Sequence, residues 1–304
     1  MAFITSGLTA YVKENENALI KDVVLGTGMK GSIISDLNLQ TGVKTSERIH
    51  YMDTDVVLQS GGTCGFNASG NTQFTERTIT TGQFKVNSTY CPEDLLAKFN
   101  EGKVKINANE GDLPYEAQIM DAIVLGIDKQ MEVLAFQGST GSGDLIDGLL
   151  TQALGSDSSS TVVVTASTGA SAYQRILGVY MAIPEQIVDD AVIFVSPSLF
   201  RSYVQDLVAA NLYHYDPAFS GELTEMFLPG ASTKIRKAYG LSGSDDIYCS
   251  SMKNLYAACD LENSMEEIKL WFSDDDDIWK LKVRYNFGVA SLWPDMVIVG
   301  TIGE

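Results

Sequence analysis

The stretch of residues 32–90 most constrains how this chain can fold, because it favours strands yet offers little material for a core. Two segments are rich in the Thr, Phe, Val and Ile that strands prefer, IHYMDTDVVLQ at 49–59 and QFTERTITTGQFKV at 73–86. A loop-like segment separates them, SGGTCGFNASGN at 60–71. The pattern predicts a long β-hairpin with largely polar faces. An isolated hairpin is marginally stable, so we expect this one to be mobile or to lie on another chain.

The charge balance excludes two classes of protein. The 304 residues include 39 Asp and Glu against 21 Lys and Arg, a formal charge of −18. A sequence-independent nucleic-acid binder needs a positive surface, and an anionic membrane would repel this chain. Apolar runs such as VIFV at 192–195 are far shorter than the ~20 residues of a membrane span, and the start of the chain lacks a signal-peptide pattern. We therefore expect a soluble protein kept in a cytoplasm.

A long amphipathic helix is predicted over 113–136, and a glycine-rich segment at 138–143 ends it. A shorter helix is predicted at 91–101, where Pro92 suits the first turn. The long helix carries apolar residues three or four positions apart, which we expect to face the core: Ile119, Ile123, Ile127, Met131 and Leu134.

The next part of the chain, from 141 to about 262, predicts a compact α/β unit. Strands are expected at 161–167 and 191–196, and helices at 171–183 and 197–213. Ser196 is a suitable N-cap for the second helix, and Pro197 suits its first position. One face of that helix is expected to carry Leu199, Tyr203, Leu207 and Ala210.

The end of the chain returns to strands. Segments 266–273 and 278–287 flank four aspartates, which predicts a hairpin with an acidic turn, and 296–303 predicts a last strand. In 278–287 the apolar residues alternate with basic ones, so the two kinds should face opposite sides. The apolar set is Trp279, Leu281, Val283 and Tyr285, and the basic set is Lys280, Lys282 and Arg284. We interpret the basic set as an intersubunit ion-pair edge.

A catalytic or cofactor site is not indicated. The two histidines, His50 and His214, have no partner nearby in the sequence, and the four cysteines have no CxxC spacing. The glycine-rich segment 138–148 has Asp144 where a phosphate loop needs Lys, and that acid would repel phosphate. The sequence therefore favours a structural protein that is not an enzyme and needs no cofactor.

The acidic turn is a weak candidate for a metal site. Calcium prefers carboxylate oxygens, but an EF-hand loop would need Gly and Glu at positions that hold Trp279 and Tyr285 here. A solvated hairpin tip is favoured over a metal site. The weak candidates are Asp274, Asp275, Asp276 and Asp277.

The order of these elements resembles the major capsid protein of tailed bacteriophages, with the HK97-like fold. Three segments carry the resemblance: FQGSTGSGDLIDGLL at 136–150, IPEQIVDDAVIFVSPSLFRSYVQDL at 183–207 and VRYNFGVASLWPDMVIVG at 283–300. The first looks like the family's segment after the spine helix, the second like its A-domain strand and helix, and the third like its closing pattern.

The resemblance implies an α+β fold with four parts. They are an N-terminal arm at 1–31, an E-loop hairpin at 45–90, a P-domain at 32–44, 91–140 and 264–287 with a spine helix at about 113–136, and an α/β A-domain at 141–263 and 288–304. It also implies that the E-loop tip takes part in assembly, through Gly61, Gly62, Gly65 and Gly70.

The function implied is self-assembly into hexamers and pentamers of an icosahedral shell around double-stranded DNA. The implied partners are further copies of the chain, portal, scaffold, and neck or decoration proteins, with DNA bound only non-specifically and no membrane. The implied location is the virion capsid, assembled in the bacterial cytoplasm. Three alternatives remain open: an encapsulin-like nanocompartment shell, a phage minor or decoration protein, and a non-viral α/β ligand-binding protein.

Overall fold

The computed structural model describes residues 31–59, 69–91, 115–211, 225–260 and 267–303, together with Asn15 and Leu19. Several predicted features fall outside these residues. They are nearly all of the N-terminal arm, the helix at 91–101 apart from Cys91, the tip glycines Gly61, Gly62 and Gly65, and His214. Among the described helices, none is long and apolar enough to cross a membrane.

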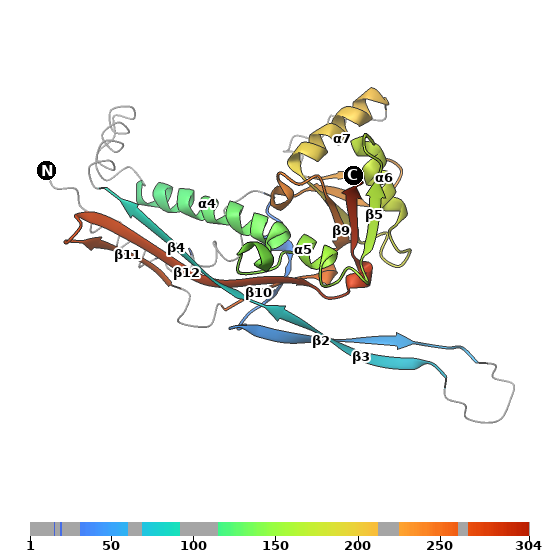
Figure 1. Cartoon of the computed structure of the whole chain (residues 1–304), viewed down its shortest axis with the longest axis horizontal. Helices are drawn as coiled ribbons and strands as arrows, with labels where there is room; N and C mark the ends of the chain where they lie inside the picture. The colour runs from blue at the N-terminus through green and yellow to red at the C-terminus, as the bar shows by residue number, and fades with distance from the viewer. Residues whose placement is uncertain are drawn as a thin grey trace.

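An elongated five-stranded sheet forms one part of the molecule (Figure 1). Its order is β1 (Asn38–Gln40), β10 (Leu255–Cys259), β12 (Ile278–Ser291) and β11 (Glu267–Ser273), and β4 (Gly82–Tyr90) also pairs with β12. β12 runs antiparallel to β4, β10 and β11. The predicted hairpin with the acidic turn is confirmed, and its second strand continues past residue 287 to reach β10.

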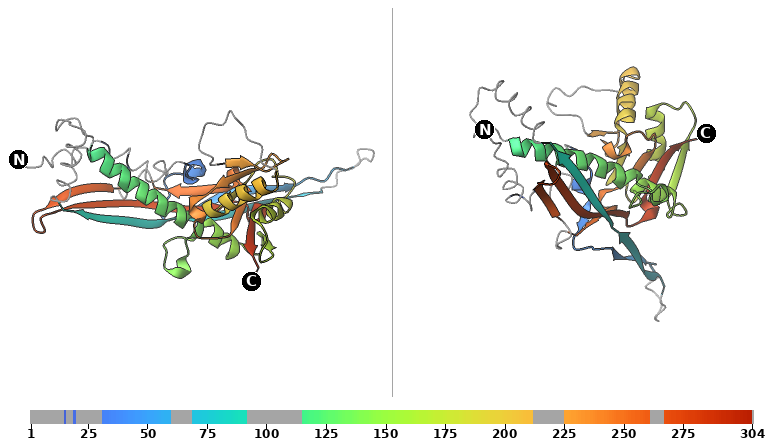
Figure 2. Two further views of the ribbon diagram at one scale, coloured as in Figure 1. Left: turned by 90° about the horizontal axis from the view of Figure 1, so that it is seen from above. Right: turned by 60° about the vertical axis from the view of Figure 1, so that its left-hand side comes forward.

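The predicted long helix is confirmed as α4 (Tyr115–Gln137), which lies along this sheet (Figures 1 and 2). Of the predicted stripe, Ile127 and Met131 are buried, Ile123 is half-buried and packs against the core, Leu134 is only half-buried, and the side chain of Ile119 lies outside the description. A row with a strict spacing of four residues drifts about 40° around the helix at each step. The buried apolar face therefore also includes Met120, Val124, Ala135 and Phe136.

A six-stranded sheet forms the core of the other part. Its order is β5 (Val162–Ala166), β13 (Ile298–Ile302), β9 (Ile247–Ser251), β6 (Ala191–Val195), β8 (Lys234–Lys237) and β7 (Glu225–Phe227). Helices α6 (Ala172–Met181) and α7 (Pro197–Ala209) cover one face, and the end of α4 with α5 (Leu149–Leu154) covers the other. Both faces are therefore buried, which explains the uninterrupted apolar run of β6.

Local signals set the ends of these helices. Ser171 and Gln174 form a capping box at the start of α6, and Ser196 accepts a hydrogen bond from the Leu199 amide ahead of Pro197. Ala210 is exposed, contrary to prediction, because α7 ends one residue before it. Short 3-10 turns join the elements: η1 (Ile34–Asp36), η2 (Thr140–Ser142), η3 (Tyr239–Leu241), η4 (Met252–Asn254) and η5 (Pro294–Met296).

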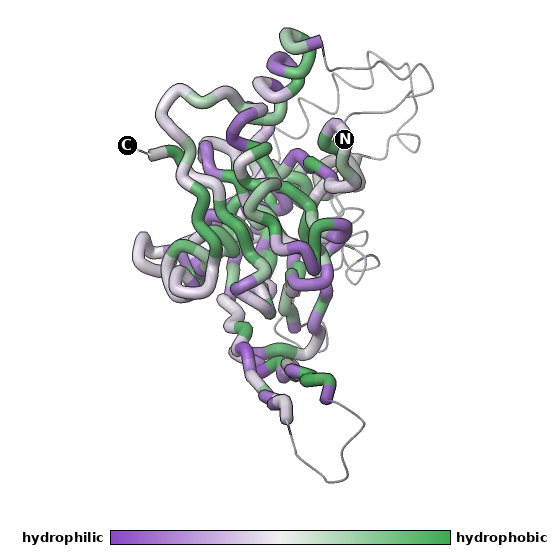
Figure 3. The backbone as a smooth tube through the Cα atoms, turned by 90° about the vertical axis from the view of Figure 1, so that its right-hand side faces the viewer, coloured by the Kyte–Doolittle hydropathy of each residue, from purple (hydrophilic) through white to green (hydrophobic). Residues whose placement is uncertain are grey.

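The predicted polar hairpin is confirmed as β2 (Ser46–Asp55) and β3 (Asn71–Thr80), which project from the body of the molecule (Figures 1 and 3). Its second arm differs from the prediction, because 73–86 is not one strand. β3 ends at Thr80, and from Gly82 the chain continues as β4 in the five-stranded sheet. A Cβ at Gly288 of β12 would overlap the Thr80 carbonyl oxygen, so the crossing requires glycine there.

Candidate interaction surfaces

The β2–β3 hairpin exposes large apolar side chains. Met52 and Phe74 face each other across the hairpin and are 60% and 78% exposed. Three further apolar residues follow β2 and are also exposed, namely Val56, Val57 and Leu58. We call these five residues the hairpin patch. Exposed apolar side chains gathered in this way are typical of a surface that another molecule covers.

The base of the hairpin is fixed to the body. Two apolar residues are buried there, Ile79 of β3 and Val43, which lies just before β2. They form one cluster with Ala258 of β10 and Ala290 of β12. The ring of Tyr51 contacts Trp293 edge-on, with 5.6 Å between ring centroids. The hairpin is therefore a supported projection that presents Met52 and Phe74 on the face opposite to Tyr51.

A half-buried ion pair also holds the hairpin. The guanidinium of Arg77, on β3, contacts the carboxylate of Asp157, which follows α5. The side chain of Asp157 is 4% exposed and that of Arg77 is 24% exposed. Removing one partner of such a pair leaves the other charge poorly solvated.

We expect Asp157→Asn to lower the free energy of unfolding of the unassembled subunit by about 2 kcal/mol, because Arg77 loses its counterion. Urea denaturation measures the change. The matched control is Glu76→Gln, which breaks the exposed Arg48–Glu76 pair on the same hairpin and is expected to cost less than about 1 kcal/mol. Equal losses in the two variants would show that the Arg77–Asp157 pair does not anchor the hairpin.

Basic residues gather on the solvent-facing side of the five-stranded sheet. They lie on adjacent strands β4, β11 and β12, and we call them the basic strip: Lys85, Lys269, Lys280, Lys282 and Arg284. Lys269 lies directly opposite Lys282, and Lys85 lies directly opposite Arg284. Glu267 is the other register partner of Arg284. These register positions therefore bring several positive charges close together on one face of the sheet.

The charges of the basic strip lower the pKa of one of its own lysines. The pKa of Lys282 is lowered by partial burial and then by the neighbouring charges of Arg284, Lys269 and Lys85. Lys280 instead contacts the carboxylate of Asp276 within the same hairpin. Lys280, predicted to pair between subunits, therefore has an acidic partner inside its own subunit.

The acidic turn Asp274–Asp277 joins β11 to β12. Asp276 accepts hydrogen bonds from Lys280 and Ser273, and these bonds with the charge of Lys280 lower its pKa. Within the described residues, no group of three His, Cys, Asp or Glu side chains is placed to hold a metal ion.

Gly70 is the one described glycine of the predicted E-loop tip. It has φ of +92°, and a Cβ there would overlap the Asp55 carbonyl oxygen.

Two buried acids on α4 were missed by the sequence analysis. Asp128 and Glu132 are both 0% exposed, and their spacing of four residues puts them on one helix face. Burial raises the pKa of Glu132 to about 7, although the nearby backbone amides of Gly240, Ile33 and Tyr239, and the charge of Arg236, act to lower it. Glu132 thus lies where α4, η3 and the segment that leads into η1 meet, and neither of its carboxyl oxygens has a hydrogen-bond partner among the described residues.

The cysteines differ in exposure. Cys249 and Cys259 are buried, as expected for structural thiols, whereas Cys91 is exposed. Burial raises the pKa of the Cys249 thiol, so it stays protonated and unreactive. His50 is exposed on the hairpin.

Comparison with known proteins identifies the architecture. No family model matches the chain, and no curated protein sequence matches it. Among solved structures, the satellite phage P4 procapsid with its size determination (Sid) protein aligns over 100% of this chain and 93% of its own, with TM-score 0.63 and 10% identity. The chain has the HK97-like capsid fold.

Two further structures agree with the HK97-like fold. The capsid of an empty GTA particle aligns over 91% of both chains, with TM-score 0.59 and 10% identity. A virus-like particle from Pyrococcus furiosus aligns over 94% of this chain and 97% of its own, with TM-score 0.54 and 10% identity. In this chain the HK97-like fold presents the hairpin patch and the basic strip on separate surfaces.

Proposed function

We propose that this chain is the major capsid protein of a tailed phage, which self-assembles into the hexamers and pentamers of an icosahedral shell around double-stranded DNA. The observation that carries the proposal is the likeness to capsid structures over 91–100% of the chain. The projecting hairpin supports it, because a shell subunit must reach its neighbours through extended elements. The role is structural, with no reaction catalysed.

The proposal assigns parts of the chain to shell roles. Residues 1–31 form the N-terminal arm and the β2–β3 hairpin forms the E-loop. The five-stranded sheet with α4 forms the P-domain, and β4 is assigned to it rather than to the E-loop because it pairs with β12. The six-stranded sheet with α6 and α7 forms the A-domain. The glycines Gly61, Gly62, Gly65 and Gly70 belong to the E-loop tip.

The strong negative charge fits a container for DNA. A shell of subunits with a formal charge of −18 does not bind the phosphate backbone tightly, so DNA can be packaged and released. The same charge makes subunits repel one another, so contacts between copies must supply the compensating burial. Portal, scaffold, and neck or decoration proteins are the further partners, and assembly takes place in the bacterial cytoplasm.

The basic strip serves, in this proposal, as a docking surface for an acidic surface of a neighbouring copy. The strip gathers five cations on one sheet face, and the remainder of this chain is strongly acidic, so the strip is electrostatically complementary to the surface of another copy. The residues involved are Lys85, Lys269, Lys280, Lys282 and Arg284, of which Lys280 also contacts Asp276.

We expect Lys269→Gln to slow shell assembly. It removes a charge from the docking surface, so the assembly rate followed by light scattering should fall. The matched control is Lys253→Gln, an exposed lysine outside the strip. Unchanged assembly in Lys269→Gln would remove the strip from the interface.

Electron microscopy with light scattering tests the main proposal. The purified protein, at low and at moderate ionic strength, is expected to form closed shells or rings of five and six subunits. A stable monomer under every condition, with scaffold protein present, would contradict it.

A second candidate is an encapsulin-like nanocompartment shell, because the likeness to a virus-like particle from Pyrococcus furiosus shows that a particle other than a phage capsid has this fold. The contents of particles purified from their native source distinguish the two candidates. Packaged double-stranded DNA supports the phage capsid, and enzyme cargo supports the nanocompartment.

A further inference from the structure

The six-stranded sheet has an unprotected edge at β5, its outermost strand, which pairs only with β13 among the described strands. Proteins ordinarily protect such an edge with a charge, a proline or a bulge, because its free backbone amides and carbonyls can pair with another chain. β5 has none of these, since its five residues, VVVTA at 162–166, pair with β13 without interruption. Val162 and Val163 are 37% and 44% exposed. The edge of β5 is therefore open to another strand.

The opposite edge of the same sheet is β7, which carries a largely exposed aromatic side chain. Within the part of the chain that the structure describes, β7 pairs only with β8, and its last residue, Phe227, is 57% exposed. Met226, the residue before it, packs against the core cluster that α6 and α7 cover. Because successive side chains of a strand alternate, Phe227 lies on the other face of the sheet, which the end of α4 covers with α5.

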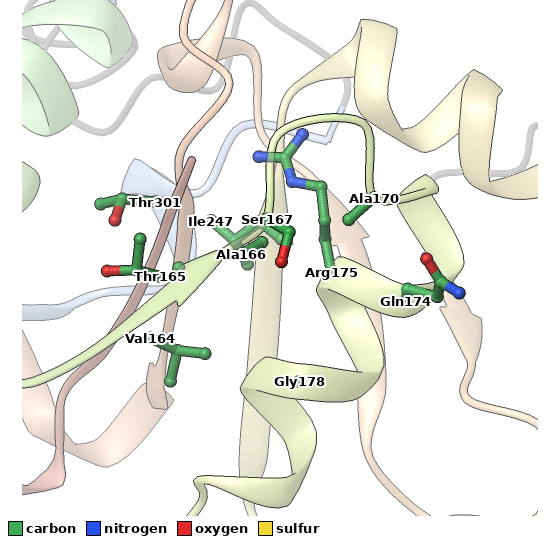
Figure 4. A pocket seen from close by; sticks show the side chains of 11 residues that line it. Val164, Thr165, Ala166, Ser167, Ala170, Gln174, Arg175, Gly178, Ile247 and Thr301 are labelled. Atoms are coloured by element: carbon green, nitrogen blue, oxygen red, sulfur yellow. The ribbon is translucent and has the colours of Figure 1, made fainter. Parts of the chain in front are cut away.

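The exposed valine in the middle of β5 lies on this same face. Figure 4 shows β5 beside α6, with Val164 pointing toward the helix and Thr165 pointing away from it. Val164 packs against the core cluster that α6 and α7 cover. By alternation, Val163 lies on the face of Thr165, away from α6. One face of the sheet therefore presents Val163 at one edge and Phe227 at the other.

The two edge strands run in opposite directions. β5 is parallel to β13, and β6 is parallel to β8. β9 is antiparallel to both β13 and β6, so β5, β13, β6 and β8 all point the same way. β7 is antiparallel to β8 and therefore also to β5. A neighbouring copy displaced across the sheet, without being turned over, brings its β7 alongside β5 as an antiparallel pair.

Both edges also lack the negative charge that would repel a second copy. The chain has a formal charge of −18, yet no charged residue lies between Asp157 and Arg175, the stretch that contains β5. Near β7, no charged residue lies between Glu225 and Lys234, and these two form an ion pair with each other. Two copies can therefore approach through these edges without the local repulsion that acidic side chains would produce.

We propose that β7 of one copy pairs with β5 of the next, so that the six-stranded sheets join around a ring of copies. The inference rests on the proposed shell function and names the surface through which the copies of one ring meet. A contact between two different edges is head-to-tail, which is the kind of contact that closes into rings. With Phe227 opposite Val163, all three residues of β7 pair with residues 163–165, and the two exposed side chains form an aromatic–aliphatic cross-strand pair.

Disulfide crosslinking of the assembled full-length chain tests the pairing. Val163→Cys and Phe227→Cys are introduced together, in a chain whose Cys64 and Cys91 are changed to serine. Five strand spacings, roughly 24 Å, separate the two positions within one subunit, so oxidation can join them only between copies. We expect a ladder of covalent oligomers that ends at five and six chains on a non-reducing gel. The two single-cysteine variants are the controls and should stay monomeric on the gel.

A charge on the edge tests whether the pairing contributes to assembly. Val163→Lys gives β5 the lysine that protected edge strands often carry, so the yield of rings and shells should fall at least tenfold while the subunit stays folded. The matched control is Val208→Lys, which places the same charge at another exposed valine, on α7, and should assemble like the wild-type protein.

The outcomes separate this pairing from the proposed function. Closed shells without the covalent ladder, or normal assembly of Val163→Lys, would overturn the pairing and leave the shell function in place. A covalent dimer formed by Val163→Cys alone would also overturn it, because β5 would then meet β5 of another copy across a two-fold axis. A wild-type chain that stays monomeric under every condition would overturn both.

Discussion

Replacing both Met52 and Phe74 by glutamate is expected to abolish closed shells while the subunit still folds. Both side chains are largely exposed in the subunit, but the two glutamates would lie directly opposite each other, so the free energy of unfolding should fall by about 1–2 kcal/mol, which still leaves a folded subunit. In a shell, covering each of them would contribute about 1.5–3 kcal/mol. Losing two such contributions at every hairpin, and adding two charges to an acidic chain, should lower shell yield at least a hundredfold, measured by sedimentation and electron microscopy.

The control for this variant is Gln73→Glu. Gln73 precedes Phe74 in β3, so its side chain lies on the opposite face of the hairpin, and the substitution adds the same kind of charge. Normal shells in Gln73→Glu together with their absence in the double variant would locate the contact on the Met52–Phe74 face. Normal shells in the double variant would contradict the assignment of the hairpin patch to an interface.

The hairpin also shows what the sequence can predict and where prediction stops. Its two strands and its loop follow from composition, because strand-forming residues flank a segment rich in Gly, Ser and Asn. The change of pairing partner at Thr81, from β2 before it to β12 after it, does not follow from composition, because β3 and β4 are both strand-like and no local signal specifies a partner. The pairing of β4 with β12, some 200 residues later in the chain, decides where β3 ends.

The helix α4 shows a second limit. Its length and position were predictable from the apolar periodicity, and so was the contact of Ile123 with the core, but Leu134 is only half-buried. Asp128 and Glu132 occupy core-facing positions, and charged residues at such positions are ordinarily assigned to solvent. The groups that accommodate Glu132, including the amides of Gly240 and Ile33, are remote in the sequence, so only the fold brings them together.

The stability of the subunit is expected to fall as the pH rises from about 4.5 to about 7, because of Glu132. The folded state holds this carboxyl protonated up to a pKa of about 7, whereas the unfolded chain releases the proton near 4.5. Unfolding therefore releases a proton in this window, so the free energy of unfolding decreases with rising pH, by about 3 kcal/mol in all. Above pH 7 the loss is complete, and the buried carboxylate stays as a cost to the contact between α4 and η3.

Glu132→Gln should remove this dependence, since the amide does not titrate and has nearly the same shape. At pH 8 the variant is expected to be more stable than the wild-type protein by up to about 3 kcal/mol, and at pH 4.5 the two should be nearly equal. Urea denaturation at several pH values measures the difference, in which the titration of other groups cancels. Asp121→Asn, an exposed acid on the same helix, is the control and should follow the wild-type curve. Parallel curves for Glu132→Gln and the wild-type protein would show that Glu132 is ionised in the folded state throughout this range.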